Sequence, residues 1–172
     1  MLIHRPPETG AGEELWRGLM RVKKEGLAKE IGVSNYSLKL IETLVDATGE
    51  APAVNQIEWS PFGYSDDMQS YCQQHKIIIQ DYSPLTRTKR LYDEPLKEIA
   101  QKYNKTSAQV LVRWNLQGGT VPLPKANQTE HLKENMHVYR LPGNLSCPYQ
   151  GIDTGGGSGR LFAARTLRSL FG

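Results

Sequence analysis

Hydrophobic and polar positions follow two different spacings along the first 141 residues. Short apolar runs, each followed by polar residues, are centred near residues 2, 31, 54, 78 and 121. The segments between them place apolar residues every three or four positions, as Leu15, Leu19 and Val22 do. Compact apolar runs are typical of buried strands, and a period near 3.6 is typical of amphipathic helices. The pattern therefore predicts five strands separated by helices.

Residues that can cap helices refine these boundaries. Ser37 precedes one helical segment, and Thr106 or Ser107 can begin the second of two helical segments within residues 94–116. Each of these side chains can accept a hydrogen bond from the first free backbone N–H groups of a helix. Asn127 stands three residues before Glu130, and this spacing predicts an N-cap with a reciprocal acid at the third helical position.

Strands that alternate with helices are typical of a parallel sheet covered by helices, so the predicted class is α/β. A (β/α)8 barrel fits best, because polar residues follow the strands at their carboxyl ends, where the active sites of barrels lie. An open, doubly wound sheet is the alternative. The sequence contains neither of the glycine-rich phosphate-binding signatures of that class.

A lysine-bearing turn joins the last predicted strand to the last predicted helix. Residues 121–135 read VPLPKANQTEHLKEN, in which Lys125 stands just before the start of the helix. Free backbone N–H groups and the positive end of the helix dipole favour an anion at such a point. The turn therefore predicts an anion site, with an ordinary strand-to-helix turn and a surface lysine as the alternative.

Composition and charge limit the partners. The chain of 172 residues is 38% hydrophobic and 23% charged with a net charge of +3, which is usual for a globular protein and provides no basic stripe for nucleic acid. No apolar run approaches the roughly 20 residues of a membrane helix, and no secretory signal is visible. Cys72 and Cys147 are differently flanked, so structural disulfides are not expected. We therefore expect a cytoplasmic protein.

Six short motifs resemble a known family. They read LIHRP, IGVSNYS, VNQIEWSP, DYSPL, SAQVLVRW and PLPKANQTEHLKEN, and their order and spacing resemble the C-terminal half of an aldo-keto reductase over residues 1–141. The resemblance implies a partial (β/α)8 TIM barrel made of barrel strands four to eight. It also implies a function, because aldo-keto reductases transfer a hydride from NADPH to the carbonyl carbon of an aldehyde or ketone while a tyrosine donates the proton.

The resemblance also implies roles for residues at the strand ends. His4 is similar to the histidine that orients the substrate carbonyl, and Tyr82 is similar to the tyrosine whose ring stacks on the nicotinamide. The other residues resemble cofactor contacts: Ser34, Asn35 and Gln56 at the nicotinamide carboxamide, Ser83 and Leu85 along the pyrophosphate, and Lys125, Asn127, His131, Glu134 and Asn135 at the adenosine end. An aromatic face and directed hydrogen bonds position a nicotinamide without reacting with it.

Three positions differ from the pattern of the family. His131 stands where the family has an arginine for the 2′-phosphate, and Ala126 stands where it has a serine. An imidazole cannot replace a bidentate guanidinium, so the preference for NADPH over NADH should be reduced or pH-dependent. Asp81 stands where alanine is usual and places a carboxylate beside Tyr82.

The remaining catalytic residues of the family, an aspartate, a tyrosine and a lysine, lie on the first three barrel strands, which this sequence does not match. We therefore expect the isolated chain to be inactive toward small carbonyl substrates, as a truncated gene product would be. A non-catalytic or regulatory module that binds nicotinamide nucleotides is the alternative. An incomplete ring should also leave residues 2–3 and 120–123 as exposed sheet edges, which favours self-association.

Residues 142–172 depart from the family pattern. They contain GIDTGGGSG, which has the composition of a flexible linker, followed by RLFAARTLRSLFG, which is rich in arginine and has an apolar side. The expected division is an incomplete barrel over residues 1–141 and a disordered tail over residues 142–172. A membrane-surface helix in the tail is the alternative.

Overall fold

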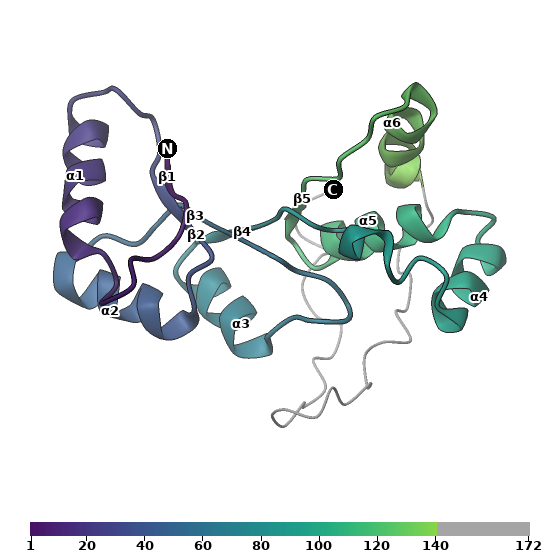
Figure 1. Cartoon of the computed structure of the whole chain (residues 1–172), viewed down its shortest axis with the longest axis horizontal. Coiled ribbons are helices and arrows are strands. Elements are labelled where there is room, and N and C mark those ends of the chain that lie inside the picture. The colour runs from purple at the N-terminus through teal and green to yellow at the C-terminus, as the bar shows by residue number, and fades with distance from the viewer. Residues whose placement is uncertain (141–172) are drawn as a thin grey trace, which may run out of the picture.

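The computed structural model describes residues 1–140, which form one parallel sheet with helices along its outside (Figure 1). The predicted tail, 142–172, lies outside the described residues. All five predicted strands are present, in the order in which they occur in the chain. They are β1 (Leu2–Ile3), β2 (Gly32–Ser34), β3 (Val54–Ile57), β4 (Ile78–Asp81) and β5 (Val121–Pro122). Each neighbouring pair is parallel, so the predicted α/β class is confirmed.

Helices connect the strands, as their periodicity predicts. They are α1 (Glu13–Lys24), α2 (Leu38–Thr48), α3 (Asp66–Gln74), α4 (Glu94–Lys102), α5 (Ser107–Gln117) and α6 (Thr129–Met136), together with the short 3-10 helices η1 (Thr86–Thr88) and η2 (His137–Arg140). The predicted cap of α2 is confirmed, and of the two candidates for α5, Thr106 and Ser107, the cap is Thr106. Ser37 accepts a hydrogen bond from Leu40 N–H, and Thr106 forms a complete capping box with Gln109.

The predicted cap of α6 is wrong. The N-cap residue is Gln128, one position later than Asn127, and it caps the helix with backbone only. Asn127 lines a cavity instead of turning back toward the first turn of the helix. The reciprocal contact with Glu130 therefore does not form, and α6 begins without the side-chain hydrogen bond that the spacing indicated.

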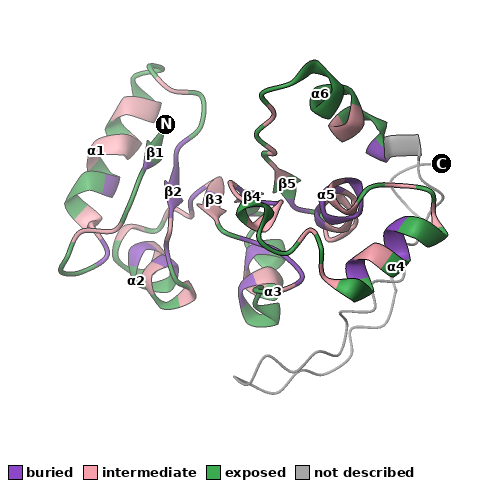
Figure 2. Ribbon diagram, turned by 45° about the vertical axis from the view of Figure 1, so that its right-hand side comes forward, coloured by how far each residue is buried: buried purple, intermediate pink, exposed green. Residues whose placement is uncertain are grey.

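Two hydrophobic clusters hold the described part of the chain together. Figure 2 shows buried residues on the strands and α1 to α3, and again on α4 and α5. The larger cluster lies between the strands and α1 to α3 and includes the fully buried Trp16, Ile41 and Leu44. The smaller cluster is built from α4, α5 and η2, and its centre includes Leu111 and Val138. The smaller cluster thus supports the region in which α6 follows β5.

Close packing around Gly32 fixes the separation of the first three strands. A Cβ atom on Gly32 would lie 2.6 Å from the carbonyl oxygen of Val54 and 2.8 Å from a side-chain carbon of Leu2. Real Cβ atoms do not approach backbone oxygen so closely, so β1, β2 and β3 can pair at this separation only with glycine in the middle strand.

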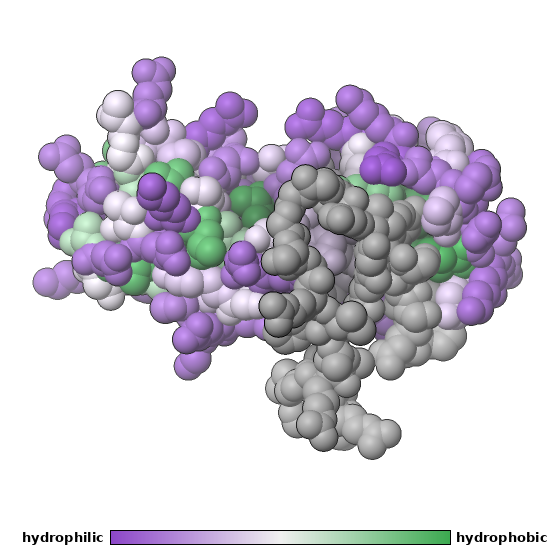
Figure 3. Space-filling model, turned by 90° about the horizontal axis from the view of Figure 1, so that it is seen from below, coloured by the Kyte–Doolittle hydropathy of each residue, from purple (hydrophilic) through white to green (hydrophobic). Residues whose placement is uncertain are grey.

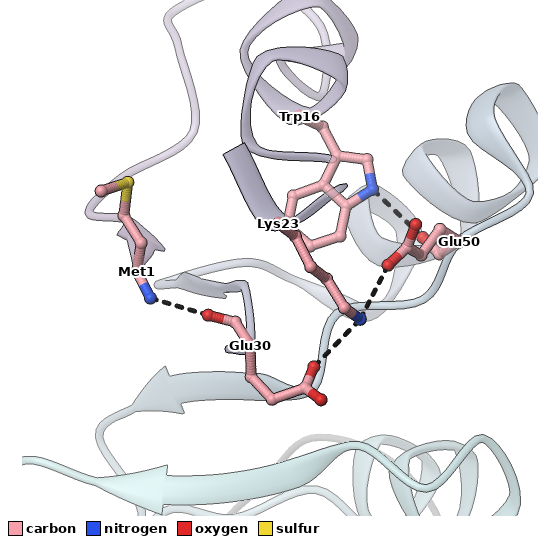
Figure 4. A network of polar contacts seen from close by, with 5 residues as sticks. All are labelled: Met1, Trp16, Lys23, Glu30 and Glu50. Atoms are coloured by element: carbon pink, nitrogen blue, oxygen red, sulfur yellow. Dashed lines mark hydrogen bonds and ion pairs between the residues drawn. The ribbon is translucent and has the colours of Figure 1, made fainter. Parts of the chain in front are cut away.

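A polar network ties α1 to the start of β2 and the end of α2 (Figure 4). Lys23 Nζ lies 3.0 Å from a carboxylate oxygen of Glu30 and 3.0 Å from one of Glu50, and both contacts raise the pKa of Lys23. Trp16 Nε1 donates to the carbonyl oxygen of Glu50 over 3.1 Å. These contacts lie at the amino ends of the strands, away from the polar residues that follow the strands.

The surface is mixed in polarity. Seen from below, hydrophobic side chains emerge between hydrophilic ones, most clearly over the half that holds α1 to α3 (Figure 3). Leu15 and Leu27 are exposed there. Among residues 1–140, no helix combines the length and hydropathy needed to cross a bilayer.

Candidate functional site

Three of the predicted site residues, Ser34, Asn35 and Gln56, form one polar group at the carboxyl ends of the strands, together with the backbone of His4. Ser34 Oγ donates to the carbonyl oxygen of Gln56 over 2.7 Å. Asn35 Nδ2 donates to the carbonyl oxygen of His4 and to Ser34 Oγ, each over 3.1 Å. Asn35 has a φ of 61°, a left-handed conformation that asparagine tolerates better than most residues. The ends of β1, β2 and β3 are therefore linked through the side chains of Ser34 and Asn35.

Tyr82 connects this group to the loop that follows β4. Its hydroxyl donates to Asn35 Oδ1 over 3.0 Å, which fixes the end of the ring. Gln56 uses its side-chain amide differently, because Nε2 donates to Gln80 Oε1 over 2.6 Å. Gln80 was not among the predicted residues, although it lies opposite Gln56 in the register of the two strands.

A cavity of about 520 Å³ begins at Tyr82 and extends to α6. Six of the predicted residues line it: Tyr82, Ser83, Leu85, Lys125, Asn127 and His131. Arg87, Thr88 and Gln128 also line it and were not predicted. None of the lining residues carries a carboxylate, whereas Arg87 and Lys125 carry positive charge. The cavity is therefore suited to an anionic ligand and has the size of an ordinary small-molecule site.

The remaining predicted residues lie elsewhere. His4 is exposed at the end of β1 and meets the polar group through its carbonyl oxygen. Glu134 and Asn135 are half-buried on α6 and do not line the cavity. The carbonyl oxygen of Glu134 accepts from Gln109 Nε2 over 3.0 Å, so this residue connects α6 to α5.

The wall formed by η1 has an unusual backbone. Thr86, Arg87 and Thr88 have φ values of 49°, 51° and 64°, so three consecutive residues other than glycine are left-handed. Such residues cost on the order of 1–3 kcal/mol each and persist only where the surrounding structure holds them. Arg87 Nη2 also lies 3.9 Å from Glu58 Oε2, and both side chains are largely exposed. The turn carries the Arg87 side chain to the cavity.

Asp81 lies beneath Tyr82 and is completely buried. Its Oδ1 accepts hydrogen bonds from the backbone N–H groups of Trp59 and Ser83. Burial raises the pKa of this carboxyl from 3.8 to about 6, although these N–H groups and the nearby side chain of Asn115 lower it. The carboxylate noted beside Tyr82 in the sequence therefore faces the interior rather than the cavity.

Known proteins similar to this chain are aldo-keto reductases. The family model for the aldo/keto reductase family matches residues 1–145. The 2,5-diketo-D-gluconic acid reductase B of a Corynebacterium species is 38% identical over 140 residues, which are 80% of this chain and 50% of that protein. An uncharacterized oxidoreductase of Schizosaccharomyces pombe is 42% identical over 136 residues, or 79% of this chain and 49% of that one. The chain thus spans about half the length of these relatives.

Solved structures of aldo-keto reductases also match this chain. An aldo/keto reductase from Brucella melitensis has a TM-score of 0.75 and 36% identity, and the match covers 83% of this chain and 56% of that one. A variant of Gox0644 in complex with NADPH has a TM-score of 0.77 and 39% identity, and the match covers 81% of this chain and 52% of that one. These structures confirm the TIM-barrel type of fold. The chain belongs to the aldo/keto reductase family.

Proposed function

We propose that the cavity between Tyr82 and His131 binds NADPH, so that this chain supplies the cofactor-binding part of an aldo-keto reductase site. The main support is that six residues predicted to contact the cofactor, from two separate stretches of sequence, line one cavity without a carboxylate. The complex of the similar Gox0644 variant with NADPH supports the same ligand. When bound, NADPH supplies the hydride for reduction of a carbonyl carbon.

The residues present fit this ligand at both ends of the cavity. The ring of Tyr82, fixed through its hydroxyl by Asn35, offers a flat face for the nicotinamide. Lys125 and Arg87 place positive charge where phosphate groups would lie, and charged hydrogen bonds of this kind are stronger than neutral ones. Asn35 and Ser34 are hydrogen-bonded to each other and Asn35 accepts from the Tyr82 hydroxyl, so they lie next to the proposed nicotinamide end without lining the cavity.

Titration of the chain with NADPH, followed by tryptophan and nucleotide fluorescence, tests this proposal. We expect saturable binding, and we expect Lys125→Ala to weaken it about tenfold, because one charged contact with a phosphate is lost. Lys39→Ala is the matched control, since Lys39 is an exposed lysine on α2 that does not line the cavity. Equal affinity of the Lys125→Ala variant and the unchanged chain would contradict the assignment of Lys125.

We further propose that the 172-residue chain alone binds the nucleotide without reducing aldehydes or ketones. The resemblance assigns His4 to the substrate carbonyl, and His4 is the one predicted catalytic residue in this sequence. General acid catalysis typically contributes about 10²–10⁴-fold, and an exposed histidine without a partner acid would not supply it. Absorbance of NADPH, followed with a reactive aldehyde, measures turnover. Rapid oxidation that His4→Ala abolishes would overturn this proposal.

A further inference from the structure

Asp81, the last residue of β4, lies where three loops meet. Its Oδ1 accepts from the backbone N–H of Trp59, 3.1 Å away, and from that of Ser83, 2.9 Å away. Its own carbonyl oxygen accepts from Leu123 N–H over 2.8 Å. One residue therefore connects the loop after β3, the loop after β4 and the end of β5.

These contacts act on the two residues that begin the cavity. Tyr82 and Ser83 follow Asp81 directly and line the cavity, whereas Asp81 does not. Tyr82 N–H donates to the carbonyl oxygen of Ile57 over a longer 3.3 Å, so the 2.9 Å bond to Ser83 is the shorter tether of this segment. We propose that Asp81 is a positioning residue, which holds Tyr82 and Ser83 toward the nucleotide through Oδ1 as a hydrogen-bond acceptor. This inference rests on the proposed function.

The two hydrogen bonds to Asp81 require an acceptor oxygen at this position and do not require its negative charge. Both N–H groups converge on the same oxygen, while Oδ2 is buried without a hydrogen bond among the described residues. Burial opposes ionisation of the carboxyl, and the negative charge of Glu58 at the end of β3 opposes it further. From α5 the carboxyl meets the neutral side chain of Asn115. An amide oxygen in the same place would serve equally well, because it also accepts two hydrogen bonds.

Two substitutions in the full chain separate the acceptor from the charge. Asp81→Asn keeps an acceptor at the position of Oδ1, whereas Asp81→Ala removes the acceptor of the buried Trp59 N–H and the part-buried Ser83 N–H. We expect Asp81→Ala to weaken NADPH binding about tenfold and Asp81→Asn to change it by less than about threefold. Asn55→Ala is the control for general loss of stability, since Asn55 is equally buried but bonds the carbonyl oxygen of Tyr36, outside the cavity.

Hydrogen exchange of the backbone N–H groups of Trp59 and Ser83 provides a measurement that needs no nucleotide. We expect slow exchange in the unchanged chain and in Asp81→Asn, and faster exchange in Asp81→Ala. Unaltered exchange and binding in Asp81→Ala would overturn the positioning role, and so would equal loss of binding in both variants. If the unchanged chain does not bind NADPH, the proposed function fails, and the exchange rates still decide whether Asp81 fixes this segment.

Discussion

His131 lines the cavity together with Tyr82, Asn127 and Lys125. It is exposed, and its imidazole can offer one nitrogen to a phosphate, whereas a guanidinium offers two in a fixed fork. On the proposed function, we expect this one short side chain to bear on the choice between NADPH and NADH. A longer, forked cation should therefore increase the discrimination between the two nucleotides.

We predict that His131→Arg strengthens binding of NADPH relative to NADH by roughly three- to tenfold, because the 2′-phosphate gains a bidentate partner. Parallel fluorescence titrations with the two nucleotides measure this ratio. His137→Arg is the control, since His137 is an exposed histidine beyond α6 that does not line the cavity. An equal gain for both nucleotides would show that residue 131 does not reach the 2′-phosphate.

The burial of Asp81 leads to a separate prediction about the stability of the protein. Its pKa of about 6 in the folded chain exceeds the ordinary value of 3.8, so the folded state binds the proton more tightly than the unfolded state. The stability that this provides is present at low pH and is lost as the pH rises through about 6. Asp81→Asn removes this loss, and we expect it to raise the free energy of unfolding near pH 8 by up to about 3 kcal/mol.

Urea denaturation of both chains across the pH range measures the effect. The gain from Asp81→Asn should shrink steadily as the pH is lowered from about 6 through 3.8, because below that value the carboxyl becomes protonated in both states. A gain of the same size at both ends of the range would show that the substitution acts through packing rather than through the charge.

Individual site residues could be predicted where a clear strand precedes them. Tyr82 follows β4, whose first residues belong to the apolar run Ile77, Ile78 and Ile79, and Lys125 follows β5, so the parallel sheet brings both to one end. Arg87 could not be found in this way. Its left-handed turn contains threonine and arginine rather than glycine or asparagine, and such a sequence gives no signal for positive φ.

At the scale of elements, α5 is the helix on which the cavity region depends. Thr106 Oγ1 accepts from Gln109 N–H over 3.2 Å, and Gln109 Oε1 accepts from Thr106 N–H over 3.2 Å. The remaining amide group of Gln109 donates to the carbonyl oxygen of Glu134 on α6. One buried glutamine therefore caps α5 and also connects it to the helix that carries His131.

We predict that Thr106→Ala lowers the free energy of unfolding by about 1 kcal/mol, which is typical for loss of an N-cap. Gln109→Ala should cost about 1–3 kcal/mol, because it also leaves the Glu134 carbonyl without this donor. Urea denaturation measures both values, with Thr43→Ala on the exposed face of α2 as the control. Equal effects of Thr106→Ala and Gln109→Ala would contradict the connection to α6.

The N-termini of the helices show which local sequence signals are enough to predict a cap. The cap at Ser37 and a cap at Thr106 or Ser107 were predictable, because such a side chain can meet a backbone N–H within its own turn. The same reasoning failed for Asn127, whose side chain lies at the cavity. A capping signal is therefore reliable only where no tertiary contact competes for the same side chain.

Over the whole molecule, the sheet has two open edges within the described residues. β1 pairs with β2 alone and β5 with β4 alone. Leu2 is 37% exposed and Val121 is 41% exposed, so each edge presents apolar surface beside unpaired backbone groups. Edges of this kind pair with other chains unless charges or bulges prevent it.

We predict concentration-dependent self-association of the chain, which sedimentation velocity can measure. Leu2→Lys combined with Val121→Lys should reduce it, because charged edge residues oppose strand pairing. Leu27→Lys is the control, since Leu27 is 74% exposed but lies outside the strands. A monomeric unchanged chain at all concentrations would contradict this prediction.

The strand order was predictable from the sequence, since strands linked by single helices usually lie side by side. The extent of the cavity was not, because it depends on how far α6 stands from the loop after β4. No sequence pattern specifies that separation, which the packing of η2 and α5 determines through Val138 and Gln109.

The attachment of α6 has a consequence for how the protein responds to heat. No residue of α6 is buried, so this helix is held by the bond from Gln109 and by Val138 just beyond its end. The strands, in contrast, lie against a continuous apolar core. Warming should therefore release α6 before the sheet melts, and nucleotide affinity should decline at temperatures where the strands are still intact.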